Sequence, residues 1–320
     1  MRKKKYLPKI SKSRFDNLLK ERKVEDLDLI DAVDNFFIKK RGYVFRKPKA
    51  KTKVILLLSG GIDSTVAWAA LLDIYNYQVY PLIIDRGLKK RAKRELRAVK
   101  NLEKHFSAKY PENYIKPFHL HVNPTPKEVL DLSNEKLLTA NDLLNNFNQN
   151  NKMVNNQSNV VITRANGISP YLMSFYAVFY ADYLKYTKGI NIKDIYTGIN
   201  FSDGFVIPSQ SFTSLRTTLL SICGAKAEYD WNFSSVFLER EMGLMLDKKE
   251  TIKLGKHLKV PFEKTWSCYQ HKLFQCGDAC ATCVDRRNSF KEAGVEDKTI
   301  YMFNLWYTIR QRLKKALIKV

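Results

Sequence analysis

The clearest hydrophobic pattern in the chain is the run of residues 54–58, which are all apolar and do not alternate with polar residues. Such a run predicts a strand buried on both faces, as in a parallel sheet covered by helices. After this run, apolar residues recur at helical spacing and predict a helix that extends to residue 72. Further apolar runs, interpreted as strands, cover residues 78–85, 118–122 and 194–200, and a helix is predicted over residues 89–105. This order predicts an α/β fold with a doubly wound, Rossmann-like parallel sheet that binds ligands at the carboxyl ends of its strands.

The segments around this pattern are predicted to be mostly helical. Residues 11–23 and 24–40 carry apolar positions at helical spacing, so we expect two amphipathic helices that pack on the body or on a partner through Phe36 and Phe37. Other expected elements are a polar surface loop at the Asn-rich residues 141–159, an apolar helix at 171–186, a short helix from residue 248 with Gly255 at its end, and a basic amphipathic helix at 299–319. The chain is thus divided into a basic helical extension (1–50), a sheet domain (51–247) and a C-terminal helical segment (248–320).

The net charge of the chain is +23, and residues 1–53 alone carry 18 Lys and Arg against 7 Asp and Glu. An excess of this size favours a polyanionic or acidic partner, although a Lys-rich surface exposed to solvent gives the same count. The chain has no apolar run of membrane-spanning length, and its first residues lack the apolar stretch of a signal peptide. These features predict a cytoplasmic protein without a membrane partner.

A glycine-containing loop, Ser-Gly-Gly-Ile-Asp-Ser at residues 59–64, follows the first predicted strand. Its glycines permit unusual backbone angles and a close approach to a ligand, and Asp63 or Ser64 can cap the next helix. Loop amides, the positive end of the helix and the nearby hydroxyl groups form a cradle for phosphate. The chain has neither the G-x-x-x-x-G-K-[ST] nor the G-x-G-x-x-G pattern, so other common phosphate loops are excluded.

This loop resembles the pyrophosphate loop (PP-loop) of the ATP pyrophosphatases, which cleave ATP between its α and β phosphates and attach AMP to a substrate oxygen. The resemblance makes residues 51–247 a PP-loop domain and implies ATP and Mg²⁺ as ligands. It assigns catalytic roles to Asp63 and Ser64. The phosphate-binding residues that it implies are Ser59, Gly60, Gly61, Asp63, Ser64 and Thr65, with Asp85 and Arg164 at later strand ends.

Two histidines, His119 and His121, lie two residues apart, so a strand at 118–122 presents both on one face. No carboxylate in the sequence is an obvious partner for them, and we interpret them as structural.

Four of the five cysteines gather near the C-terminus, in the pattern Cys268-x₇-Cys276-x₃-Cys280-x₂-Cys283. Four soft thiolates suit a closed, tetrahedral and therefore structural Zn²⁺ site, and a site in which His271 replaces one cysteine would also be structural. An iron–sulfur cluster and thiols without a metal are the alternatives. The fifth cysteine, Cys223, is expected to be a small buried residue.

The PP-loop and the cysteine cluster together, with Thr-Trp-Ser-Cys at 265–268, make residues 53–295 similar to the 7-cyano-7-deazaguanine synthase (QueC) family. That family adenylates the carboxylate of 7-carboxy-7-deazaguanine, forms the amide with ammonia and dehydrates it to the nitrile with a second ATP. The resemblance implies a catalytic, phosphate-stabilising role for Lys249, for which a solvent-exposed lysine is the alternative. The residues expected to bind the substrate are Asn166, Asn200 and Asp203.

The chain departs from the family pattern at residues 207–211, where Ile-Pro-Ser-Gln-Ser stands in place of Tyr-Pro-Asp-Cys-Arg and removes an acidic and a basic contact. This change and the basic extension favour a divergent ligase of antiphage defence, which stops at the amide and joins the deazaguanine to an amine of a partner protein. The alternatives are the standard synthase with ammonia, a tRNA-modifying PP-loop enzyme and, last, a nucleotide-binding module without enzymatic activity. Nucleic acid is a less favoured partner, and the sequence is compatible with a homodimer.

Overall fold

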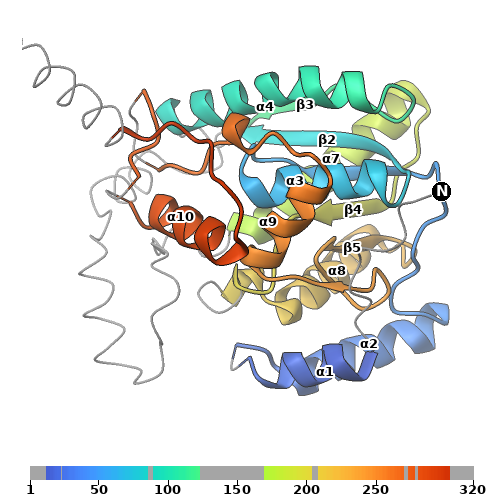
Figure 1. Ribbon diagram of the computed structural model, residues 1–320. Helices are drawn as coiled ribbons and strands as arrows, with labels where there is room; N and C mark the ends of the chain where they lie inside the picture. Colours follow the sequence, from blue (N-terminus) through green and yellow to red (C-terminus); the bar gives the residue numbers. More distant parts are fainter. Residues whose placement is uncertain are drawn as a thin grey trace, which may run out of the picture.

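The computed structural model of the chain describes residues 12–22, 24–85, 89–122, 169–203, 208–269, 273–277 and 280–302 (Figure 1). Several predictions concern residues outside these ranges. They are Arg164, Asn166, His271, the Asn-rich stretch at 141–159, and the C-terminal helix beyond residue 302.

The body of the protein is a five-stranded parallel sheet with the strand order β3-β2-β1-β4-β5. The predicted doubly wound parallel sheet is therefore confirmed. The chain leaves β1 toward β2 on one side and returns to β4 on the other, so the switch point at which open α/β sheets bind ligands lies between β1 and β4. The strands are β1 (Lys53–Leu57), β2 (Gln78–Asp85), β3 (Phe118–His121), β4 (Asp194–Thr197) and β5 (Asn232–Ser235).

Helices cover both faces of this sheet (Figure 1). Val54 and Leu56 of β1 pack in one apolar core with α3, α4 and α9, whereas Ile55 packs in a second core with α7 and α8. Successive residues of β1 thus point to opposite faces, and both faces are dry, which explains its unbroken apolar run. The covering helices are α3 (Ile62–Asp73), α4 (Lys89–Lys109), α7 (Ser169–Lys188), α8 (Phe212–Lys226) and α9 (Lys248–His257), and α10 (Ala281–Ala293) packs on α9.

The N-terminal helices α1 (Lys12–Lys20) and α2 (Leu27–Arg41) pack on the body, where α2 lies along α8. Phe37 is fully buried, whereas Phe36 is 38% exposed. A buried ion-pair network joins the two parts, because Arg216 of α8 donates to Asp34 of α2 at 2.9 Å and to Glu239 of the short strand β6 (Leu238–Glu239) at 2.8 Å. β6 pairs with β7 (Leu244–Met245).

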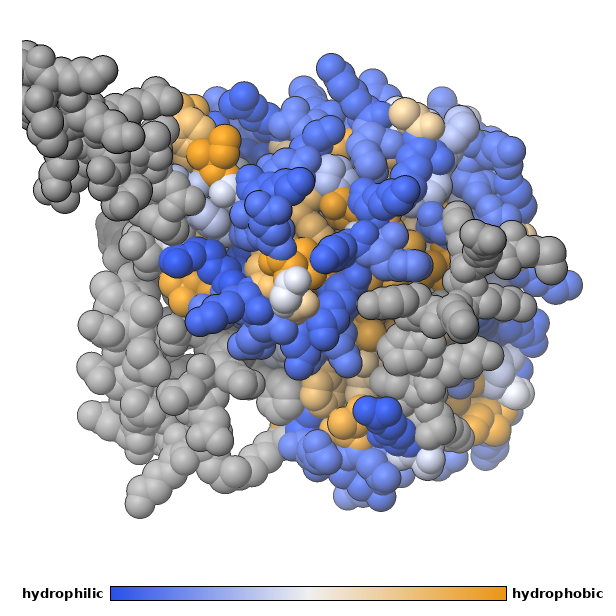
Figure 2. All heavy atoms as spheres, viewed as in Figure 1, coloured by the Kyte–Doolittle hydropathy of each residue, from blue (hydrophilic) through white to orange (hydrophobic). Residues whose placement is uncertain are grey.

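Three further observations concern the sequence predictions. The sequence places Gly255 at a helix end, but α9 continues to His257, and the glycine serves close packing against Phe262. The basic residues Lys93, Arg97 and Lys100 of α4 are exposed. The face of the molecule in Figure 2 is largely hydrophilic. Among the described helices, none is both long enough and apolar enough to cross a membrane.

Candidate active site

The turn between β1 and α3 carries the predicted phosphate loop to the carboxyl end of the sheet. Gly60 has a φ of +76°, and a Cβ atom there would lie 2.9 Å from the carbonyl oxygen of Glu95, so glycine is required. α3 begins at Ile62 with Gly61 as its N-cap, and no side chain caps it. The amide end of α3 is therefore open to an anion. The expectation that Asp63 or Ser64 caps this helix is wrong.

The three hydroxyl groups of the loop have different tasks. The Oγ atoms of Ser59 and Ser64 lie 3.0 Å apart, and both residues line a cavity. Thr65 is fully buried, and its Oγ1 donates a hydrogen bond to the carbonyl oxygen of Gly61 at 2.7 Å. Ser59 and Ser64 can therefore meet a ligand, whereas Thr65 holds the loop from the inside.

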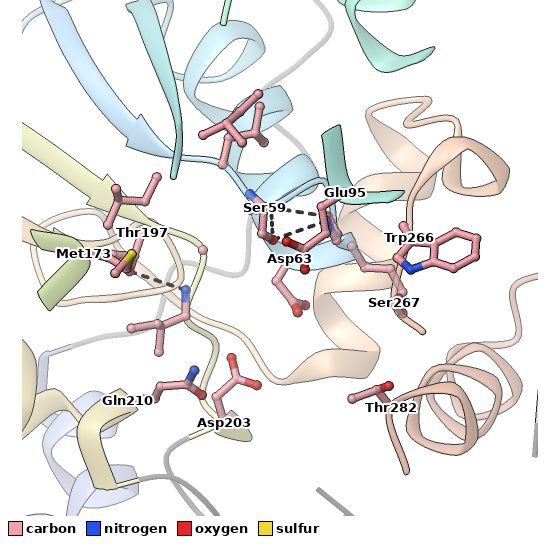
Figure 3. A pocket seen from close by; sticks show the side chains of 18 of the residues that line it. Ser59, Asp63, Glu95, Met173, Thr197, Asp203, Gln210, Trp266, Ser267 and Thr282 are labelled. Carbon is pink, nitrogen blue, oxygen red and sulfur yellow. Dashed lines mark hydrogen bonds between the residues drawn. The ribbon is translucent and has the colours of Figure 1, made fainter. Parts of the chain in front are cut away.

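The cavity next to this loop has a volume of about 390 Å³ (Figure 3). Residues from the ends of β1, β2 and β4, from α4 and α10, and from the segment at 266–269 surround it. Figure 3 shows Asp203 and Gln210 together on one side and Trp266 with Ser267 on another. The apolar part of the wall includes Leu57, Leu82, Ile84, Met173 and Ile199. The cavity thus combines a phosphate cradle with an apolar chamber that has polar groups at its edge.

A lysine of α9 lies opposite the loop, and it is Lys248 and not the predicted Lys249. Lys248 Nζ donates to Asp63 Oδ2, and both residues line the cavity. The Nζ of Lys249 lies 3.8 Å from Asp247 Oδ2, its side chain is 40% exposed, and it does not line the cavity. Adjacent residues of an α-helix point about 100° apart, so a shift of one position takes the side chain out of the cavity.

Charges in the cavity influence one another strongly. Burial alone would lower the pKa of Lys248, but the carboxylates of Asp63, Asp285 and Asp203 outweigh it and raise this pKa. Burial and repulsion from Asp63 raise the pKa of Asp203 to about 7, although Lys248 opposes the shift. Burial also raises the pKa of Asp285. The cavity therefore holds one firmly charged lysine and a carboxyl group, Asp203, that titrates near neutral pH.

The two residues predicted at the end of β4 also have different tasks. Asn200 is fully buried, and its Oδ1 accepts hydrogen bonds from the amides of Ser202 at 2.9 Å and Asp203 at 3.2 Å. The carboxylate of Asp203 accepts from the amide of Asn200 at 2.9 Å and also lines the cavity. Asn200 therefore shapes the turn, and Asp203 is the one of the two that lines the cavity.

Asp85, which the sequence predicts to bind phosphate, does not line the cavity. Its Oδ2 lies 3.1 Å from Nδ1 of His121 and 3.9 Å from Nε2 of His119, because the parallel register of β2 and β3 sets Asp85 beside His121. The histidines thus have the carboxylate partner that the sequence did not reveal.

Several residues at the cavity were not predicted from the sequence. Arg91 and Glu95, four residues apart on α4, form an ion pair at 2.7 Å, and the guanidinium of Arg91 lies 3.9 Å from the ring centroid of Tyr269. The sequence signal for this pair is the i, i+4 spacing of opposite charges. Gly198, at the end of β4, lies so close to the loop that a Cβ atom would come within 2.7 Å of the backbone of Ser64.

Arg286 of α10 joins the cavity wall to the cysteine-rich segment. It is fully buried, and it donates to Thr265 Oγ1 at 2.8 Å, to Ser267 Oγ at 3.2 Å and to the carbonyl oxygen of Phe262 at 2.9 Å. A single guanidinium group therefore holds the 262–267 segment against α10, the helix that contains the last cysteine, Cys283.

The four cysteines predicted to bind metal come together, with their sulfur atoms all within 4.8 Å of one another. Cys276 and Cys280 have sulfurs 3.4 Å apart, and Cys280 and Cys268 have sulfurs 3.9 Å apart. Zn–S bonds of about 2.3 Å at tetrahedral angles place sulfurs about 3.8 Å apart, so the cluster fits this metal. Cys268, Cys276 and Cys283 are buried, which is typical of a structural site.

The comparisons with known proteins agree with this geometry. The family model described as queuosine biosynthesis protein QueC matches residues 53–294. Similar curated proteins are the 7-cyano-7-deazaguanine synthases of Picrophilus torridus, 26% identical over 78% of this chain and 92% of that protein, and of Methanococcus aeolicus, 29% identical over 78% and 99%. The chain therefore belongs to the QueC family.

A search of solved structures gives the U34-tRNA thiolase NcsA from Methanococcus maripaludis with its [4Fe-4S] cluster. The match is 15% identical, covers 85% of this chain and 91% of that chain, and has a TM-score of 0.37. A similarity this weak does not indicate which metal or which substrate this chain binds.

Proposed function

We propose that this chain is an ATP-using 7-cyano-7-deazaguanine synthase, which converts 7-carboxy-7-deazaguanine through the amide into the nitrile. Membership of the QueC family and the names of the curated relatives support this function. The observation that carries it is the joining, in one cavity, of the open end of α3 with an apolar chamber edged by Asp203 and Gln210. Such a cavity suits a triphosphate and a planar heterocycle lying side by side.

In the first reaction a carboxylate oxygen of the substrate attacks the α-phosphorus of ATP, and pyrophosphate leaves. The amide end of α3 and the hydroxyls of Ser59 and Ser64 would bind the phosphates. Lys248 would stabilise the negative charge that develops on the leaving pyrophosphate. Asp63 Oδ1 is buried without a hydrogen-bond partner, so we assign this oxygen to the Mg²⁺ that accompanies ATP.

The substrate ring would occupy the apolar chamber between Leu82, Met173 and Ile199. A 7-deazaguanine presents both donors and acceptors along its edge. The amide of Gln210 can donate and accept, and Asp203, with a pKa of about 7, can do either according to its protonation state. We assign ring recognition to this pair, and we assign a structural Zn²⁺ to the four cysteines.

A second candidate is a ligase that stops at the amide and joins the deazaguanine to an amine of a partner protein. One observation favours it. At the position where the family pattern has arginine, Ser211 is buried and caps α8 by accepting a hydrogen bond from the amide of Ser214 at 3.0 Å. This position therefore supplies no basic contact to a substrate, whereas the family pattern provides one there.

The test is pyrophosphate release by the purified full-length chain with ATP, Mg²⁺ and 7-carboxy-7-deazaguanine. The proposal predicts a burst without ammonium and continuous release with it. 7-Deazaguanine, which lacks the carboxylate, is the matched control and should give no release. A folded protein that binds ATP but releases no pyrophosphate with the carboxylate would refute the proposed function.

A further inference from the structure

The N-terminal extension reaches the wall of the substrate chamber through two buried, charged residues. Arg22 and Glu25 precede the part of the chain that the QueC model matches, which begins at residue 53. Their side chains are both 0% exposed and form an ion pair, with Arg22 Nη1 3.0 Å from Glu25 Oε1. Charged side chains are rarely buried completely, so this pair has a specific partner in the body.

That partner is the first turn of α8. The carboxylate of Glu25 accepts a hydrogen bond from the amide of Phe212 at 3.0 Å and two from Thr213, one from its amide and one from its Oγ1, both at 2.8 Å. Ser211 accepts from the next amide. A helix start of this kind needs partners for its free amides and favours a negative charge, and a residue about 190 positions away supplies both.

The other half of the pair lies on the turn after β4. The guanidinium carbon of Arg22 is 4.6 Å from the ring centroid of Phe201. Burial lowers the pKa of Arg22, and the charges of Glu25 and Asp203 oppose this shift in part. Asp203 and Gln210, which immediately precedes the cap of α8, are the polar pair at the edge of the cavity (Figure 3). Arg22 and Glu25 thus touch both backbone segments that carry this pair.

We propose that Arg22 and Glu25 are positioning residues for the substrate ring, and that the N-terminal extension is in this way a part of the substrate site. The inference rests on the proposed function for the identity of the ring. The phosphate loop is anchored elsewhere, by Trp266, whose amide donates to Gly60 at 2.9 Å, and by the packing of α3. Loss of the Glu25 carboxylate should therefore weaken binding of the deazaguanine and leave ATP binding unchanged.

The test compares Glu25→Gln with Asp31→Asn, which makes the same charge change at an exposed position of α2. We expect Glu25→Gln to raise KM for 7-carboxy-7-deazaguanine about tenfold or more, with KM for ATP within about twofold of wild type, because small misplacements of contact groups are costly. Asp31→Asn should change neither. Unchanged KM for the carboxylate in folded Glu25→Gln, or an equal rise in both KM values, would overturn the inference.

Two additions keep the test decisive. If Glu25→Gln does not fold, Glu25→Asp, which keeps the charge but shortens the reach, must show the same selective rise in KM. If the wild-type chain does not turn over the carboxylate, the proposed function fails, and amide hydrogen exchange of residues 208–220 decides the inference instead. Exchange about tenfold faster in Glu25→Gln than in Asp31→Asn supports the positioning role, and equal exchange overturns it.

Discussion

Replacing Lys248 with methionine removes the cation that faces the carboxylates of the cavity and keeps a side chain of similar length. Lys248 contacts Asp63 directly, and Asp203 and Asp285 act on it as well. If Lys248 stabilises the charge on the leaving pyrophosphate, its loss should lower the rate of pyrophosphate release about 10²- to 10³-fold, the effect of removing one preorganised group at a developing negative charge. The matched control is Lys249→Met, because the side chain of Lys249 is 40% exposed and does not line the cavity.

The same substitution should change the titration of its neighbours. Lys248 now opposes the upward shift of the Asp203 pKa, so its removal should raise this pKa above its present value of about 7. The assay is the initial rate of pyrophosphate release between pH 6 and 9, with unfolding curves to show that both variants are folded. A rate in Lys248→Met within about threefold of wild type, or an equal loss in Lys249→Met, would refute the reasoning.

Three further predictions concern the cavity and the metal. The pKa of Asp203 is raised in the folded protein, so this residue adds stability below its unfolded pKa of about 4, and that stability is lost as the pH rises through about 7. The Tm of wild type should therefore fall relative to that of Asp203→Asn between pH 5 and 8. Parallel Tm curves for the two proteins would contradict this prediction. Gly198→Ala should weaken ATP binding at least about tenfold in calorimetry, because the added Cβ atom would collide with the backbone of Ser64. Gly224→Ala in α8 is the control, because no atom lies within 4 Å of an added Cβ there, and this variant should bind ATP as wild type does. The purified chain should contain one zinc per molecule by mass spectrometry, Cys280→Ser should lose it and Cys223→Ala should keep it; iron in place of zinc would contradict the assignment.

Local patterns in the sequence were sufficient to predict the centre of the fold. The apolar run of β1, the glycine loop and the apolar start of α3 are contiguous, and each is specified by near neighbours in the chain. β5 was missed because its residues, Asn232–Ser235, carry no apolar pattern, although all four are buried in the sheet. Their burial follows from the pairing with β4, which is a contact between distant segments.

The candidate site residues also divide into those that local sequence predicts and those that depend on contacts between distant segments. The loop alone was sufficient to place Ser59 and Ser64 at the cavity, but choosing between Lys248 and Lys249 depends on the rotation of α9, which tertiary packing determines. The partner of His121 depends on the register of β2 and β3. The contact of Glu25 with α8 joins segments that nothing in the local sequence connects. Long-range contacts therefore limited the prediction of the site more than residue chemistry did.

The most direct test of the account is the mass of the product that forms from 7-carboxy-7-deazaguanine with ATP, Mg²⁺ and ammonium. The proposed function predicts a product lighter than the amide by one water, which is the nitrile, and the conversion of two ATP to AMP for each molecule formed. A reaction that stops at the amide would contradict the synthase and leave the ligase that uses a partner-protein amine as its replacement.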